Sequence, residues 1–373
     1  MTNLGDWLTY VAVTSFAASR ADAASSLGFV VLGQTLPRAL LAPLAGRLSD
    51  RFDRRAVYAA AEIGRGLLAL GMAYFSERGE IGTVLWLHAA RGGIGAVSDT
   101  AMRAALPSYV PSRELEAVNR RLGTLWSVAF VMGVLGGGVL VSQSSPYVAF
   151  VVDGITFFVG AAAWLTLGKA LPEAHEPSNA SPSSYASSST EIPSMTYLRA
   201  PLALVHGAAF VLTAAHGKGA VVTPLAIGFL HAGRALGNAI GAELGNRRSM
   251  LYLATPIGLA GVLMAVHGSA PTSNATVAPM GAVLWGLGMG STYIFVTTTL
   301  QVQVPRETLG KALARDTLAF TLAWALGAMA ASVATGPWHV PPSRIVLVLT
   351  MVSIGAFGVL VAEHRAKARK ARR

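Results

Sequence analysis

Residues 46–55 of this 373-residue chain read GRLSDRFDRR, and they stand between two long apolar runs at 26–46 and 56–75. An α-helix needs about 20 mainly apolar residues to cross a bilayer. A short connection that carries four arginines is typical of a loop on the cytoplasmic side of a membrane. The stretch therefore predicts a hairpin of two membrane-spanning helices whose turn faces the cytoplasm.

Apolar runs of this kind recur along the whole chain. Residues of the hydrophobic set make up 53% of the sequence and charged residues only 13%, against roughly 25% charged residues in soluble proteins. This composition excludes a soluble enzyme, and a backbone in lipid must satisfy its own hydrogen bonds, which favours helices. We predict an all-α polytopic membrane protein with twelve spans, near residues 4–20, 26–46, 56–75, 81–99, 122–142, 146–167, 199–217, 222–243, 249–268, 278–300, 315–335 and 344–362.

The first predicted span is short. Its 16 residues from Leu4 to Ser19 rise about 24 Å as a helix, which is less than the roughly 30 Å of a hydrocarbon core. Local thinning of the bilayer, or a first helix that begins upstream of Met1, would account for the difference. No positively charged region precedes the span, so we do not expect a cleaved signal peptide.

The lysines and arginines set the expected orientation. With both termini in the cytoplasm, 20 of the 29 basic residues fall in inside loops or in the tail at 365–373, and 4 fall in outside loops. This bias predicts a multi-pass protein of the inner (plasma) membrane with both ends cytoplasmic. It also accounts for the net charge of +11 without a nucleic-acid partner.

A Ser/Pro-rich segment divides the chain into two halves. Residues 172–198 lack the apolar content needed to order themselves, so we expect a cytoplasmic linker. The chain then consists of an N-terminal six-helix bundle at 1–171, the linker, a C-terminal six-helix bundle at 199–364 and a basic cytoplasmic tail at 365–373.

Three short matches relate the two halves to each other. They are Arg38-Ala39-Leu40 with Arg234-Ala235-Leu236, Asp53-Arg54-Arg55 with Asn246-Arg247-Arg248, and Val110-Pro111 with Val304-Pro305. Their offsets of 196, 193 and 194 residues are nearly equal, which indicates a duplicated six-helix unit. Parallel repeats of six spans with a site at the midplane between them are typical of one large class of transporters.

The loop quoted first also resembles a known motif. GRLSDRFDRR is similar to the major facilitator superfamily motif G-x-L-a-D-r-x-G-r-[RK] and departs from it only at Asp53, where the family often has Gly. Gly5-Asp6-Trp7 and the segment from Pro111 to Asn119 look like the drug and siderophore exporter branch, which includes the enterobactin exporter and macrolide efflux proteins. The resemblance implies two six-helix bundles and export by alternating access.

Two further motifs match in part. Arg91 followed by Gly95 is similar to the family's R-x-x-q-G motif, with Ile94 in place of the usual Gln. Residues 133–138 resemble the antiporter motif G-P-x-x-G-G but lack its proline. From the residues alone, Gly133, Gly136 and Gly137 predict tight helix packing.

The loop motif predicts a gate at the cytoplasmic side. Gly46 permits close approach of two helices, and Asp50 suits the N–H groups at the start of a neighbouring helix. The resemblance implies that this neighbour is span 11, which we expect to start near Asp316. Arg54 is expected to pair with Asp99. The alternative for the arginines is simple retention of the loop in the cytoplasm. The predicted gating residues are Gly46, Asp50, Arg51, Arg54, Arg55 and Asp99.

Charged residues inside spans need a reason, because each carries an insertion cost of at least about 2.5–3.5 kcal/mol. Glu62 and Arg65 stand at i, i+3 and can pair as a purely structural couple. Arg91 matches a family motif position. Its expected partner is Asp6, with Glu62 as the second choice. Each histidine has packing as its alternative role. The predicted coupling and substrate residues are Asp6, Gln34, Arg38, Glu62, Arg65, His88, Arg91, Asp153 and Arg234.

These features predict a secondary active transporter that exports a small amphipathic molecule, such as a drug or siderophore, with protons as the candidate coupling ion. No catalytic constellation, metal-binding spacing or nucleotide-binding loop occurs in the sequence, so we expect no enzyme activity, cofactor or metal. The expected partners are a small-molecule substrate, protons and membrane lipids, and the expected state is a monomer. The alternatives are a lysophospholipid or other lipid transporter, and a transporter-like sensor or assembly protein without transport.

The predicted topology can be tested with single cysteines, because the chain contains none of its own. A cysteine within 172–195 should react only with membrane-permeant reagents in intact cells, whereas one in the loop at 268–277 should also react with impermeant reagents. Labelling of the linker by an impermeant reagent would contradict the twelve-span topology.

Overall fold

The computed structural model describes residues 2–18, 23–166, 194–216, 224–244, 248–270, 273 and 276–370. Most of the predicted linker at 172–198 therefore lies outside the described residues, as do Asn246 and Arg247 of the internal repeat. Within the described ranges the regular structure is helical and includes no strand.

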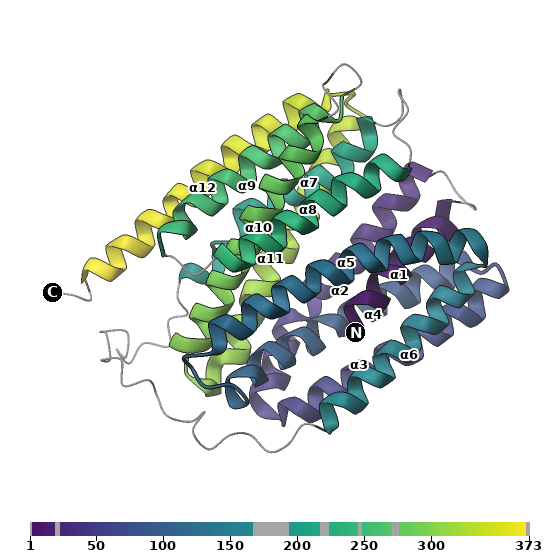
Figure 1. Ribbon diagram of the computed structural model, residues 1–373, viewed down its shortest axis with the longest axis horizontal. Helices are drawn as coiled ribbons and strands as arrows, with labels where there is room; N and C mark the ends of the chain where they lie inside the picture. The colour runs from purple at the N-terminus through teal and green to yellow at the C-terminus, as the bar shows by residue number, and fades with distance from the viewer. Residues whose placement is uncertain are drawn as a thin grey trace.

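Twelve α-helices account for nearly all of the described residues (Figure 1). Their bounds are α1 Thr2–Ala18, α2 Ala23–Arg51, α3 Arg54–Glu77, α4 Ile81–Ala105, α5 Leu115–Gln143, α6 Pro146–Leu165, α7 Ala200–His216, α8 Pro224–Leu244, α9 Arg248–Gly268, α10 Val277–Gln303, α11 Arg306–Thr335 and α12 Pro342–Lys370. Short 3₁₀ turns lie at Leu106–Ser108 and Ser194–Tyr197.

Each predicted span corresponds to one helix, so the predicted all-α fold with twelve helices is confirmed. The main difference concerns α11, which begins at Arg306, nine residues before the expected start at 315. Pro305 precedes it, and the first turns carry Glu307, Lys311 and Arg315. An apolar-run search passes over such polar turns, although the helix extends through them.

The two halves of the chain form two groups of helices (Figure 1). In the first, α3 packs against α4 and α6, α2 packs against α4, and α1 packs against α5 and α6. In the second, α10 packs against α8 and α9, and α7 packs against α11 and α12. Each group has its own buried core, one around Phe150 and Met72 and the other around Trp285 and Leu259.

The outer surface is suited to lipid. Large apolar side chains point away from the helices' contacts, and Leu40, Leu125 and Val359 are each more than 60% exposed. An extended apolar surface of this kind is unusual on a water-soluble monomer. Six of the helices, α3, α5, α6, α10, α11 and α12, are long and apolar enough to cross a membrane by the described residues alone.

Contacts between the two bundles are concentrated in two helix pairs, α2 with α11 and α5 with α8. At the first pair Gly46 lies directly against α11: a Cβ added to Gly46 would stand 2.8 Å from the Cβ of Ala314 and 3.0 Å from the carbonyl oxygen of Gly310. A residue with any side chain would push the helices apart. Gly46 therefore sets the distance between the two bundles at this end of the molecule.

The turn between α2 and α3 explains the departure from the family motif. The side chain of Asp53 accepts a hydrogen bond from the backbone N–H of Arg55, with an N···O distance of 3.1 Å, and so caps the start of α3. Aspartate is among the preferred residues at this position. The usual glycine is replaced here by a residue that stabilises the following helix.

We expect Gly46→Val to separate α2 from α11, because overpacking of a close helix contact typically has a stability cost of about 1–3 kcal/mol. Spin labels on Phe52→Cys and Glu307→Cys, which lie on opposite sides of this contact, should report a longer distance. Gly138→Val is the matched control, since an added Cβ there has no heavy atom within 4 Å. Equal label distances in the two variants would contradict this role for Gly46.

Candidate functional site

A cluster of charged side chains is buried inside the first bundle. The guanidinium of Arg65 on α3 lies between two carboxylates. Its Nη2 donates to both oxygens of Asp6 on α1 at 2.7 Å, and its Nη1 donates to Oε1 of Glu62 at 2.8 Å. Glu62 stands three residues before Arg65, so the helical spacing places the two on one face. The ring of Phe157 on α6 packs 4.2 Å from the Arg65 guanidinium carbon.

Arg91 on α4 extends the cluster to α6. Its Nη1 lies 2.9 Å from Oδ1 of Asp6 and 2.5 Å from Oδ2 of Asp153. The same Asp153 oxygen accepts a hydrogen bond from the Thr9 hydroxyl at 2.6 Å. The other oxygen, Oδ1, is buried without a hydrogen-bond partner in the part of the chain that the structure describes. The ionised form of Asp153 is therefore only half satisfied.

The charges of this cluster do not cancel. Asp6, Glu62 and Asp153 supply three carboxylates against the two guanidiniums of Arg65 and Arg91. Glu62 and Asp153 are at most 1% exposed, and an uncompensated charge at such depth is strongly unfavourable. A single proton on one carboxyl would neutralise the group. The arrangement is thus chemically able to take up and release one proton.

Arg38 forms a separate ion pair next to this cluster. It pairs with Asp99 across the α2–α4 contact, and a Cβ added to Gly95 would lie 2.9 Å from its Nη1 and 3.6 Å from the Arg65 guanidinium carbon. The expectation that Asp99 pairs with Arg54 is therefore wrong. Arg38 reaches Asp99 along adjoining helices, whereas Arg54 points toward the other bundle.

Asp50 joins the two bundles through the backbone of α11. Its two carboxylate oxygens accept hydrogen bonds from the amides of Gly310 and Lys311 at 2.7 and 2.9 Å. These amides lie just beyond the first turn of α11, and not near Asp316 as the apolar-run boundary suggested. Burial raises the pKa of the Asp50 carboxyl, while the two amide donors and Arg54 act in the opposite direction.

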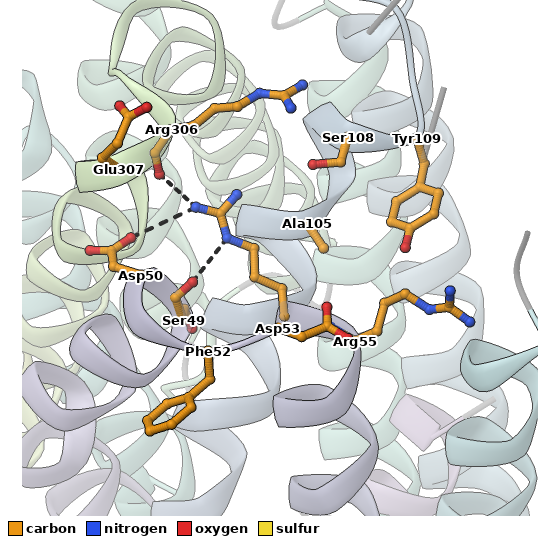
Figure 2. Close-up of a pocket in the computed structure, with 11 residues that line it drawn as sticks. Ser49, Asp50, Phe52, Asp53, Arg55, Ala105, Ser108, Tyr109, Arg306 and Glu307 are labelled. Carbon is orange, nitrogen blue, oxygen red and sulfur yellow. Dashed lines mark hydrogen bonds and ion pairs between the residues drawn. The ribbon is translucent and has the colours of Figure 1, made fainter. Parts of the chain in front are cut away.

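Arg54 contacts three segments at the same place. Figure 2 shows Ser49, Asp50 and Arg306 around the pocket formed there. The Arg54 guanidinium donates to the carbonyl oxygens of Ser49 at 2.9 Å, Ala104 at 2.7 Å and Arg306 at 2.6 Å. It also lies 3.8 Å from Asp50. These contacts line one side of a pocket of about 370 Å³ between the α2–α3 turn and the start of α11.

A third contact between the bundles involves residues that the sequence analysis did not select. Asp316 on α11 is fully buried and accepts from Nη1 of Arg103 on α4 at 3.1 Å and from Nη1 of Arg199 at 2.7 Å. Arg103 also donates to the hydroxyl of Thr317 at 2.8 Å. Counting basic residues assigned Arg103 to a loop, because the predicted span ended at 99 and α4 continues to Ala105.

Uncharged side chains complete the contact. The Asn119 amide on α5 donates to Gln301 at 2.6 Å and to Thr298 at 2.8 Å, both on α10. Gln301 in turn donates to the carbonyl oxygen of Arg103 at 2.8 Å. We call the contacts of Asp50, Arg54, Arg103, Asn119, Gln301 and Asp316 between the bundles the polar lock. Arg199 supports it from within the second bundle by holding Asp316.

The remaining predicted residues lie apart from these two groups. Gln34 is half-buried on α2, where its backbone touches Gly92 of α4, and His88 is buried on α4 outside the ion-pair cluster. Arg51 is exposed, and Arg55 donates to the carbonyl oxygen of Leu165 at 2.6 Å. Gly133, Gly136 and Gly137 face α1 at Trp7, Leu8 and Val11. Arg234 is buried on α8 among aromatic rings.

Comparison with known proteins relates most of the chain to one family. The model of the Major Facilitator Superfamily matches residues 1–328. A Bacillus subtilis (strain 168) protein named "Uncharacterized MFS-type transporter YfiS" is 26% identical over 162 residues, which are 43% of this chain and 38% of that protein. The match thus spans well under half the length of this curated relative.

Solved structures show the same fold at low sequence identity. The human organic anion transporter MFSD10 (TETRAN) superposes with a TM-score of 0.72 at 16% identity, over 96% of this chain and 97% of that one. The proton:xylose symporter XylE gives a TM-score of 0.73 at 13% identity, over 97% and 94% of the two chains. A bacterial homologue of the iron transporter ferroportin in its outward-facing state gives 0.64 at 16%, over 98% of both chains.

The role of Asp50 can be tested by Asp50→Asn. Asparagine has nearly the same size as aspartate, and the substitution leaves the arginines of the loop in place. Membrane insertion and abundance of the protein should therefore remain normal. Loss of the carboxylate should weaken the bond to α11 by about 1 kcal/mol, which changes the populations of two conformations several-fold. We expect slower transport and a larger fraction of molecules with α2 and α11 apart, measured by spin-label distances. Normal transport by this variant would indicate that the loop acts only as a topology signal and not as a gate.

Proposed function

This chain belongs to the major facilitator superfamily, and from that premise we propose that it exports a small amphipathic molecule across the plasma membrane in exchange for protons. The chain is a multi-pass membrane transporter and not an enzyme. Its substrate, its direction of transport and its coupling ion are the content of the proposal. The observation that carries it is the combination of a polar lock between the bundles with a buried, charge-imbalanced cluster inside one bundle.

The polar lock supports alternating access. The bonds from Asp50 to Gly310 and Lys311, and from Arg103 to Asp316, cross from one bundle to the other at one end. Hydrogen bonds of this kind are each worth only about 0.5–1.5 kcal/mol net, or 1.5–3 when a charge takes part. A set of such bonds can hold one end closed and still be broken when the bundles rotate. Site access would then switch from one side of the membrane to the other.

The buried cluster supports proton coupling. A guanidinium stays charged in proteins, so Arg91 cannot carry the proton itself. It holds Asp6 and Asp153 through one nitrogen, and protonation of either carboxyl would release that side of the contact. Asp153 has the less satisfied charge, since its Oδ1 has no partner among the described residues. We therefore place the proton on Asp6 or Asp153, with Glu62 held by Arg65 and Tyr58.

Export is supported by the sequence motifs. The segment GRLSDRFDRR and Gly5-Asp6-Trp7 are similar to those of drug and siderophore exporters, and residues 133–138 are similar to the antiporter motif. Val134 stands where that motif has its proline. Gly133 and Gly137 lie within contact distance of α1, and the α5 helix passes this point without interruption from Leu115 to Gln143.

A growth-inhibition panel in an efflux-deficient host tests the exported substrate. Expression of the chain should raise the tolerated concentration of at least one amphipathic compound several-fold, and Asp50→Asn should reduce the effect. Unchanged tolerance across drugs and siderophores would shift the proposal toward lipid transport or a role without transport.

Proton coupling can be measured as substrate-induced proton movement in proteoliposomes. Arg91→Ala should abolish it, because loss of one partner of a buried ion pair leaves unpaired carboxylates at a cost of about 3–5 kcal/mol. Arg91→Lys should restore it only in part, since an ammonium lacks the planar fork of a guanidinium. Asp6→Asn and Asp153→Asn should each uncouple proton flux and leave downhill substrate exchange.

Glu77→Gln is the matched control for the neutralised carboxylates, because it removes the same charge from an exposed position at the end of α3. Its proton movement should equal that of the wild type. If Asp6→Asn, Asp153→Asn and Glu62→Gln all moved protons normally, the cluster would not be the coupling site.

A further inference from the structure

Arg234 is a buried cation surrounded by aromatic rings. Its side chain lies on α8 and the residue is 3% exposed. The guanidinium carbon is 4.5 Å from the ring centre of Phe130, 5.5 Å from that of Phe210 and 5.6 Å from that of Trp285. Its Nε and Nη2 are buried without a hydrogen-bond partner in the described part of the chain. Two of its donor groups are therefore unused.

The internal repeat shows how unusual this is. Arg38 occupies the matching position of the first bundle and has Asp99 as its partner. At the offset of 194 residues, Asp99 corresponds to Tyr293 and Arg91 corresponds to Trp285. The duplication has kept the arginine of α8 and lost the acidic residue that would balance it.

The other carboxylates near this part of the chain either pair with another arginine or lie far from Arg234. After residue 198 the sequence contains only Glu243, Glu307, Asp316 and Glu363. Glu243 stands nine residues after Arg234, more than two helical turns away, and pairs with Arg120. Asp316 is held by Arg103 and Arg199. Asp6 and Asp153 of the first bundle are held by Arg91.

The aromatic rings around Arg234 form a surface that crosses between the bundles. Phe130 on α5 contacts Trp7 on α1 at a centroid distance of 4.4 Å and Trp126 at 5.8 Å. On the other side Phe210 of α7 stacks on His231 at 4.8 Å. Trp7 and Phe210 are only partly buried. A flat apolar group could thus lie against rings of both bundles next to the guanidinium.

We propose that Arg234 binds the anionic group of the transported molecule, and that this substrate is an amphipathic organic anion with an aromatic or similarly flat apolar body. The inference rests on the proposed transport function and narrows its substrate class. A carboxylate can accept two parallel bonds from a guanidinium edge, here from Nε and Nη2. A cationic substrate would meet like charge, and a neutral one would leave the buried cation unbalanced.

Such a ligand would also couple binding to movement of the bundles. Its anion would be held by α8 of the second bundle, while its apolar body would lie against Phe130 and Trp7 of the first. Each bundle contributes to the site, so the bound molecule senses their relative position. Arg234 needs no proton to act, which leaves the proton to the separate cluster around Arg91.

The test is a binding measurement in detergent that does not depend on transport. Quenching of tryptophan fluorescence is followed with matched probes: 1-naphthylacetate, its amide 1-naphthylacetamide, 1-naphthylmethylamine and acetate. We expect the aromatic carboxylate to bind at least tenfold more tightly than the amide, and the amine and acetate to bind more weakly still. Equal binding of acetate and 1-naphthylacetate would overturn the amphipathic part, and a preference for the amide or the amine would overturn the anionic part.

Variants assign the preference to Arg234. Arg234→Gln should bind the carboxylate and the amide equally, with amide affinity within about twofold of the wild type. Arg344→Gln, which removes a guanidinium from an exposed position at the start of α12, should keep the tenfold preference. If Arg234→Gln retains that preference, Arg234 is not the binding group.

Two further variants separate binding from a structural role. Arg234→Met should unfold at the same or a higher temperature than the wild type, because it removes an unbalanced charge. A fall of several degrees in the unfolding temperature, together with a retained preference for the carboxylate, would show that the role of Arg234 is structural.

Phe130→Glu supplies an internal carboxylate beside Arg234, so this variant should fold and lose the preference for the carboxylate probe. Retained preference in Phe130→Glu would contradict the proposal. If the carboxylate probe binds but is not transported in proteoliposomes, the binding site at Arg234 stands and only the proposed export is refuted.

Discussion

The first bundle is organised around the guanidinium of Arg91. One of its nitrogens contacts Asp6 of α1 and Asp153 of α6, and Asp6 passes the network on to Arg65 of α3. Four helices are thus tied together at a largely buried site, where water screens and solvates the charges only weakly. The small residues around the network follow from this constraint, since Gly5 lies directly against Asp153 and any larger side chain would displace the carboxylate.

The two halves share one helical layout and differ in how they treat charge. In the first bundle Arg38, Arg65 and Arg91 have carboxylate partners within the bundle. In the second, Trp285 stands at the position of Arg91 and donates to His206 at 2.9 Å, while Arg234, at the position of Arg38, has no acidic residue at the position of Asp99. Under the proposed function this asymmetry gives the two bundles different roles: the first would exchange a proton, and the second would offer a fixed positive charge.

The fold and much of the site could be predicted from the sequence because lipid leaves few choices. Apolar length located the helices, and the spacing of Glu62 and Arg65 located their ion pair. The partners of Asp99 and Asp153 could not be predicted. The rotation of each helix about its own axis decides which charged side chains meet, and this rotation cannot be read from a single sequence. Asp316 was missed as a member of the polar lock for a related reason. The predicted helix start lies near Asp316, whereas the observed start at Arg306 places Asp316 nearly three turns inside α11, against Arg103.

The side chains at the α2–α3 turn form hydrogen bonds mainly with backbone atoms of the neighbouring helices. Asp50 accepts from two amides of α11, and Arg54 donates to carbonyl oxygens of α2, α4 and α11. Every residue type except proline offers the same amide and every residue type the same carbonyl. The side chains of α11 at these positions are therefore free to drift over evolution without loss of the contact, provided that Gly310 stays small. Covariation between residue pairs of α2 and α11 should therefore be weak at these positions, although the two bundles pack closely here.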